Sequence, residues 1–183
     1  MACKRAPSGA RLMPGVGPLE TMDAHSLLAE IDQVLPPVLK PKPNDVAFHA
    51  LGCGQCDDLR ADLTEYSDRV LPPEAIRYIH NELSCLSAHG LRWVLPSYLK
   101  VCLTQDLYDP LETEFLIYNL APNPEDEADA RQRLSALDLR QLMCLLHFLE
   151  WCRDHPHWST YCPTEIADGI LFLQSVADAC REA

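Results

Sequence analysis

The sequence contains no uninterrupted run of the ~18 apolar residues that a membrane-spanning helix needs. Its first residues also lack the continuous apolar segment of a secretory signal peptide. We therefore expect a soluble, cytoplasmic protein. Positive charge is scarce as well: 15 Lys and Arg residues stand against 27 Asp and Glu residues, which gives a formal net charge of −12. Because nucleic acids and anionic membranes are bound through Lys and Arg, the composition argues against both and favours a basic protein partner.

Motifs of common enzymes are also missing. The sequence has no Gly-x-Ser-x-Gly nucleophile elbow, no P-loop and no dinucleotide-binding fingerprint. Neighbouring carboxylates, Glu112 with Glu114 and Asp57 with Asp58, occupy positions typical of solvated surfaces. The sequence thus offers no catalytic residue, and a non-enzymatic role is the favoured interpretation.

Cysteine, in contrast, is frequent. Nine cysteines in a chain without an export signal indicate free thiols in a reducing compartment, and their odd number prevents complete pairing within one chain. Cys102, Cys144, Cys152 and Cys180 fall within helical patterns, where cysteine commonly packs as a small hydrophobic residue. We predict structural roles for these four.

The spacing of apolar residues predicts an all-α fold, a single compact domain of six or seven helices. Residues 1–20 carry Pro, Gly and Ser without an apolar period, so we expect a disordered tail ahead of a helical domain over residues 21–183. The predicted helices span about residues 23–35, 57–66, 73–83, 88–106, 109–120, 135–154 and 163–181.

The helix over residues 135–154 has the clearest apolar stripe, formed by Leu139, Leu142, Leu145, Leu146, Leu149 and Cys152. Ser135 is predicted as its N-cap, with Asp138 three residues further on. In the helix over residues 88–106, apolar side chains cover most of the circumference. We expect this helix to be the most buried element of the fold.

Prolines mark several predicted boundaries. Pro96 lies inside the helix over residues 88–106, and its missing N–H predicts a kink there or a break near Trp93. The pair Asp109-Pro110 is typical of a helix start. Residues 122–129 are acidic and contain prolines, and we expect them to form a solvated loop.

Three segments carry a resemblance to known proteins. They are His49…Cys53-Gly-Gln-Cys56-Asp-Asp-Leu, then Gly90-Leu91-Arg92-Trp93-Val94-Leu95-Pro96-Ser97-Tyr98-Leu99, and then Ser135-Ala136-Leu137-Asp138-Leu139-Arg140-Gln141. Over about residues 45–155 the chain resembles a group of small uncharacterised bacterial helical proteins of unknown function, in which a Cys-x-x-Cys element precedes a Leu-Pro-x-Tyr-Leu helix. The resemblance implies a helical fold and a bacterial origin, and it implies no catalytic residue.

Cys53 and Cys56 have the spacing of a metal knuckle or of a redox-active turn. The flanking glycines permit a tight turn, and the N-terminus of the following helix would favour thiolates. The adjacent carboxylates of Asp57 and Asp58 oppose this effect. A structural zinc ion needs four ligands, so further ones would have to come from His49, His80, Cys85 or His89.

Since these effects are close to balanced, the sequence favours structural thiols, no metal and no cofactor. Zinc bound through His49, Cys53 and Cys56 is the alternative, and a reversible disulfide is another. A second set of possible zinc ligands is Cys152, His155, His157 and Cys162. The segment His155-Pro156-His157-Trp158 is equally typical of an ordinary helix exit.

Two hypotheses of function remain. In the first, the chain is a binding or regulatory protein whose acidic surface docks a basic protein partner, for example an immunity protein that covers a toxin. In the second, it is a small metal-binding or redox-responsive domain built around Cys53 and Cys56. Metal content, thiol titration and capture of a partner would discriminate between them.

Overall fold

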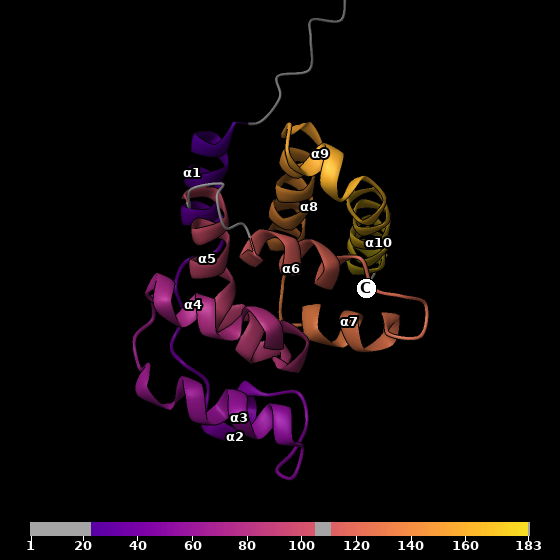
Figure 1. The fold of residues 1–183 in the computed structure, drawn as a ribbon. Helices are drawn as coiled ribbons and strands as arrows, with labels where there is room; N and C mark the ends of the chain where they lie inside the picture. Colours follow the sequence, from indigo (N-terminus) through magenta and orange to yellow (C-terminus); the bar gives the residue numbers. More distant parts are fainter. Residues whose placement is uncertain (1–22, 105–110, 183) are drawn as a thin grey trace, which may run out of the picture.

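The computed structural model describes residues 23–104 and 111–182 of the chain. These residues form ten α-helices, eight of them at least seven residues long, and two short 3₁₀ helices (Figure 1). In chain order they are α1 (Ala24–Val34), α2 (Pro43–Val46), α3 (Gly54–Asp62), η1 (Leu63–Glu65), α4 (Pro73–Ile79), η2 (His80–Cys85), α5 (Ala88–Thr104), α6 (Leu111–Leu120), α7 (Glu127–Leu134), α8 (Leu139–Asp154), α9 (Trp158–Tyr161) and α10 (Pro163–Glu182). The all-α prediction is confirmed, and the predicted number of helices is too low.

The larger part of the molecule is a bundle in which α8 packs against α10 and α1, and α5 packs against α1, α4 and α7 (Figure 1). Helix α5 is buried around most of its circumference, as predicted, with Trp93, Val94, Tyr98 and Leu99 fully inside. The predicted stripe of α8 is also buried except for Leu139, which is half-buried. Both patterns correctly located the hydrophobic core.

Helix α5 runs without a break from Ala88 to Thr104. Pro96 lies inside it, so the predicted break near Trp93 is wrong. A proline removes one backbone hydrogen bond, but the helix keeps its packing on all sides, and Pro96 itself is buried in the core. Burial of this helix therefore outweighs the local cost of the proline.

The start of α8 differs from the prediction by three residues. Asp138, not Ser135, is the N-cap: its carboxylate accepts a 2.9 Å hydrogen bond from the backbone N–H of Gln141. The Gln141 side chain in turn accepts from the Asp138 N–H at 3.1 Å, which completes a capping box. Ser135 instead caps the C-terminus of α7.

Two further predictions are wrong. The acidic segment 122–129 is only partly a loop, because α7 begins at Glu127; only Ala130 and Leu134 of this helix are buried, so its apolar period is weak. Glu112 is 1 % exposed rather than solvated, and it accepts a 2.8 Å hydrogen bond from Arg77 Nε. Such a buried carboxylate needs a partner, and its partner Arg77 is 35 residues away in the sequence.

The remaining predictions concern the last helix, the four cysteines and two segments outside the described residues. The last helix is confirmed as α10, and Cys102, Cys144 and Cys152 are buried, whereas Cys180 is exposed. The predicted tail over residues 1–20 and the helix start at Asp109-Pro110 lie outside the described residues.

The segment from α2 to η1, residues 43–66, forms a small N-terminal lobe at one end of the bundle (Figure 1). An isolated antiparallel bridge between Ala47 and Leu86 ties it to the start of α5. The Phe48 N–H donates to the Cys85 carbonyl at 2.7 Å, and the Ser87 N–H donates to the Val46 carbonyl at 2.9 Å. This pairing places residues near position 49 beside Cys85.

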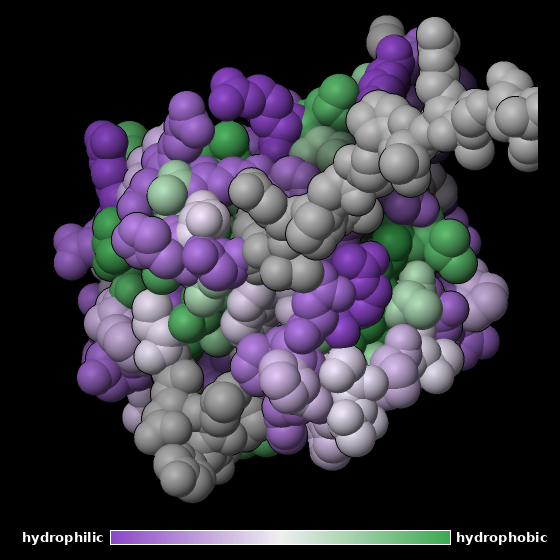
Figure 2. Space-filling model, turned by 90° about the horizontal axis from the view of Figure 1, so that it is seen from above, coloured by the Kyte–Doolittle hydropathy of each residue, from purple (hydrophilic) through white to green (hydrophobic). Residues whose placement is uncertain are grey.

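The surface agrees with the acidic composition. Figure 2 looks onto the end of the bundle where α1 and α9 lie, and hydrophilic residues dominate this face, with hydrophobic ones in small separate groups. Within the part of the chain that the structure describes, no helix is long and apolar enough to span a membrane.

Candidate functional site

The structure brings His49, Cys53 and Cys56 together. Their ligand atoms all lie within 4.8 Å of one another, and His49 Nδ1 is 3.6 Å from Cys56 Sγ. Cys53 is the N-cap of α3, and Cys56 is one turn further along, so both side chains are at the same end of this helix. The three weak candidates of the sequence thus form one cluster.

The loop that carries His49 is fixed by two charged residues of α3. The Gly52 N–H donates to Asp57 Oδ2 at 3.0 Å, and Gly52 has a φ of +102°, which is accessible to glycine at little cost. Arg60 donates to Asp57 Oδ1 at 2.7 Å and also to the His49 carbonyl. The Arg60 guanidinium therefore offsets the Asp57 charge that, from the sequence alone, opposes thiolates at this site.

Cys85 of η2, a different part of the chain, lies next to the cluster. The Cys56 thiol donates to the Cys85 carbonyl over 3.9 Å. The pKa of the Cys85 thiol is raised to about 11, mainly by burial and to a smaller extent by Cys56, Cys53 and Glu82. Two thiols and an imidazole therefore form the cluster, and Cys85 contacts it through its backbone carbonyl. Of the possible partners that the sequence offered, His49 is in the cluster, Cys85 is next to it, and His89 is outside it.

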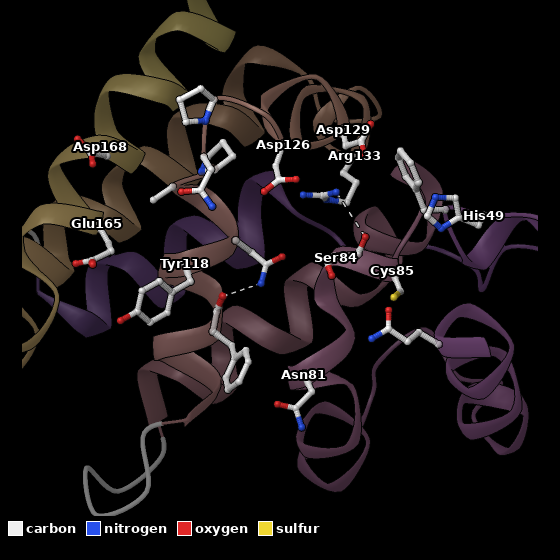
Figure 3. A pocket seen from close by; sticks show the side chains of 18 residues that line it. His49, Asn81, Ser84, Cys85, Tyr118, Asp126, Asp129, Arg133, Glu165 and Asp168 are labelled. Carbon is white, nitrogen blue, oxygen red and sulfur yellow. Dashed lines mark hydrogen bonds between the residues drawn. The ribbon is translucent and has the colours of Figure 1, made fainter. Parts of the chain in front are cut away.

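A groove of about 850 Å³ opens beside this cluster, between the N-terminal lobe and helices α6, α7 and α10. Figure 3 shows His49, Ser84 and Cys85 at one end of it and Glu165 and Asp168 of α10 at the other. Its charged lining consists of His49, Asp126, Asp129, Arg133, Glu165 and Asp168. Four carboxylates thus face a single guanidinium.

Arg133 is already engaged within the groove. Its guanidinium lies 5.9 Å from the centre of the Phe48 ring and donates to the Ser84 carbonyl at 3.5 Å. Burial lowers the pKa of Arg133, and the charges of Asp129 and Asp126 act in the opposite direction. The positive charge of Arg133 is therefore balanced by the two nearest carboxylates, and the α10 end of the groove remains negative.

The tyrosines around the α10 end show this negative potential. The pKa of Tyr161 is raised, first by the charge of Glu114 and then by burial. The pKa of Tyr118, which lines the groove, is raised by burial and then by Cys162, Glu165 and Glu114. A phenolate is disfavoured where carboxylates gather, so a cation would be favoured there.

No pattern in the sequence predicts this groove. Its carboxylates come from residues 126–129 and from α10, which are far apart in the chain, and only the fold places them on one concave surface. The acidic composition was the one available signal.

The second possible metal set is not assembled in the structure. The His155 ring packs against Trp151 with 5.0 Å between ring centres, and the His157 ring stacks on Tyr161 at 5.5 Å. Cys152 and Cys162 are buried. Within the described residues these four side chains do not form a ligand cluster, and the segment is the helix exit that the sequence also suggested.

A family model described as "Family of unknown function (DUF6714)" matches residues 56–159. The match contains Cys56, Cys85 and most of the groove, and His49 and Cys53 precede it. No curated protein matches the chain. No solved structure matches it either.

Proposed function

Because the chain belongs to DUF6714, a family of unknown function, we propose a function from the geometry: a non-enzymatic binding protein that takes a basic segment of a protein partner into its acidic groove. The observation that carries this proposal is the groove itself, with carboxylates at Asp126, Asp129, Glu165 and Asp168. A volume of about 850 Å³ lies within the ~300–1,000 Å³ range of ligand pockets. Since the charge favours a basic protein partner, the occupant in this proposal is a short loop or peptide segment of that partner.

The α10 end of the groove suits a lysine or arginine side chain. Glu165 and Asp168 are one turn apart on α10, and neither has an ion-pair partner among the described residues. The Tyr118 ring, 46 % exposed, adds an aromatic face beside them. A cation at this end would gain two carboxylates and a ring contact without displacing an existing pair.

Charge outside the groove also supports a basic partner. The formal net charge of −12 attracts a basic protein before contact and speeds productive encounters. One protein of this kind is an immunity protein, which covers the basic site of a toxin. In that form the segment inserted into the groove is a basic loop of the toxin.

The experiment compares two double variants with equal charge. Glu165→Gln with Asp168→Asn removes two charges inside the groove, whereas Glu65→Gln with Glu74→Gln removes two from exposed positions outside it. The probe is a fluorescent peptide of Lys and Arg separated by Ser, with a Glu analogue as the negative control, measured by anisotropy.

We expect the groove variant to bind the basic peptide at least ~10-fold more weakly, which is about 1.4 kcal/mol, and the control variant to bind within about twofold of wild type. Binding should also weaken as salt rises, since charges are screened beyond ~8 Å at physiological ionic strength. Equal losses in both variants would mean that net charge alone attracts the peptide, and the groove would then have no specific role.

A further inference from the structure

The cluster beside the groove has the dimensions of a metal site. Around a tetrahedral zinc ion, sulfur ligands at about 2.3 Å and a nitrogen ligand at about 2.0–2.1 Å lie roughly 3.6 Å from each other, and two sulfurs lie roughly 3.8 Å apart. The distance from His49 Nδ1 to Cys56 Sγ is 3.6 Å. Cys53 Sγ lies within 4.8 Å of Cys56 Sγ and of a ring nitrogen of His49. Small side-chain movements would bring all three onto one ion.

The fold brings a candidate for the fourth ligand next to the cluster. Cys85 is 29 residues after Cys56, and the antiparallel pairing of residues 46–48 with 85–87 brings it to the cluster. Its backbone carbonyl accepts from the Cys56 thiol, so the Cys85 residue contacts one sulfur of the cluster. The set of three sulfurs and one imidazole nitrogen is a usual donor set of structural zinc sites.

We propose that His49, Cys53, Cys56 and Cys85 bind one zinc ion as a closed Cys₃His site. On binding, each thiol transfers its proton to solvent as its sulfur forms a bond to zinc, and neutral His49 donates the lone pair of Nδ1. Three protons are released, and the two positive charges of zinc offset most of the charge of three thiolates. With four protein ligands the ion has no open position, so its role is structural and not catalytic.

A metal ion would explain why the loop over residues 49–55 has a defined shape. None of residues 49–55 is buried, and α3 buries only Cys56 and Leu59. Apolar packing therefore explains little of the ordered shape of this loop. The contacts that Asp57 and Arg60 make with Gly52 and with the His49 carbonyl fix the ligand loop from outside, as partners around metal sites commonly do.

The site also forms one wall of the groove, because His49 and Cys85 line it. Zinc would hold the N-terminal lobe against η2 and so keep the groove in shape. The zinc proposal does not depend on which partner enters the groove.

The test loads the reduced, full-length protein with zinc chloride, removes free metal by gel filtration and measures bound zinc by mass spectrometry. We expect one equivalent in wild type. Cys85→Ser should lower zinc affinity at least ~100-fold, as loss of a direct ligand should exceed the 10–100-fold cost known for second-shell changes. Cys102→Ser is the matched control, since Cys102 and Cys85 are both 8 % exposed, and it should retain one equivalent.

Cobalt(II) in place of zinc reports the donor set directly. Wild type should show the visible bands of tetrahedral cobalt and an ultraviolet sulfur-to-cobalt band, and Cys85→Ser should lose about a third of the latter, as one of three sulfurs is removed. If the variant does not fold, alkylation of wild type gives an independent readout: zinc should protect the partly exposed Cys53, while the exposed Cys180 still reacts.

Three results would overturn the proposal. Reduced wild type could retain no zinc, Cys85→Ser could retain the wild-type zinc and cobalt spectrum, or air could convert Cys53 and Cys56 to a disulfide in protein that binds no metal. The last result would establish the redox alternative instead.

Discussion

The contact between Gly90 and Val46 allows a sharp test of how the N-terminal lobe is held. Gly90 lies in the first turn of α5, and a Cβ at this position would lie 2.0 Å from the Val46 carbonyl oxygen and 3.0 Å from its carbon. These are backbone atoms, so no side-chain rotation relieves the clash. The strand-like pairing would have to move by roughly 1.4 Å to reach ordinary van der Waals contact at 3.4 Å.

The effect of Gly90→Ala on the free energy of unfolding can be estimated from this geometry. Overpacking costs about 1–3 kcal/mol, and two backbone hydrogen bonds of the pairing, at 2.7 and 2.9 Å, are worth about 1 kcal/mol each. The higher helix propensity of alanine stabilises the folded state by at most about 1 kcal/mol. We expect a net loss of about 2–4 kcal/mol in the free energy of unfolding, measured by urea denaturation.

Gly54→Ala is the matched control, because a Cβ there meets no atom within 4 Å. Its free energy of unfolding should not fall below that of wild type, and helix propensity can raise it by up to about 1 kcal/mol. The same movement in Gly90→Ala would separate Cys85 from His49, so its zinc retention should fall as well. A Gly90→Ala protein with wild-type stability would show that the lobe does not press against α5 at this point.

Three other outcomes are expected. Leu146→Ala should lower the free energy of unfolding by ~2–5 kcal/mol in urea denaturation, since it empties a buried site of α8; an unchanged midpoint would contradict the packing of that face. Asp138→Ala should cost ~0.5–2 kcal/mol and Ser135→Ala less than about 0.5 kcal/mol, and the reverse order of thermal midpoints would contradict the assigned cap. Burial raises the pKa of Cys102 and of Cys144 from an ordinary 9.0 to about 12, so the folded state keeps protons that the unfolded state loses above pH 9. Stability should therefore fall as pH rises from 9 towards 12, and a urea midpoint constant over that range would contradict these shifts.

Local patterns predicted most of the bundle. The stripe of α8, the all-round burial of α5 and the proline at the start of α10 each reflect forces that act within one helix. Helix α7 was missed because two buried residues, Ala130 and Leu134, leave too weak a period. The cap of α8 was misplaced because Ser135 and Asp138 are both good caps, and only Asp138 has Gln141 at the reciprocal position.

The site required information that no local pattern contains. The sequence grouped His49, Cys53 and Cys56 because they are close in the chain. It gave no reason to prefer Cys85 over other partners, because that choice depends on an antiparallel pairing of two segments about 40 residues apart. Glu112 was misjudged for the same reason, since its partner Arg77 is distant in sequence.

The sparse packing of the loop over residues 49–55 has a consequence for how the molecule opens. The free energy of local opening follows the apolar contacts that an opening breaks, and α3 contributes few of them, whereas α5 and α8 hold the core. The amide protons of residues 49–58 should therefore exchange with solvent through a partial unfolding that leaves both long helices protected. One wall of the groove would then detach while the bundle stays intact, and a bound ion would set how often this happens.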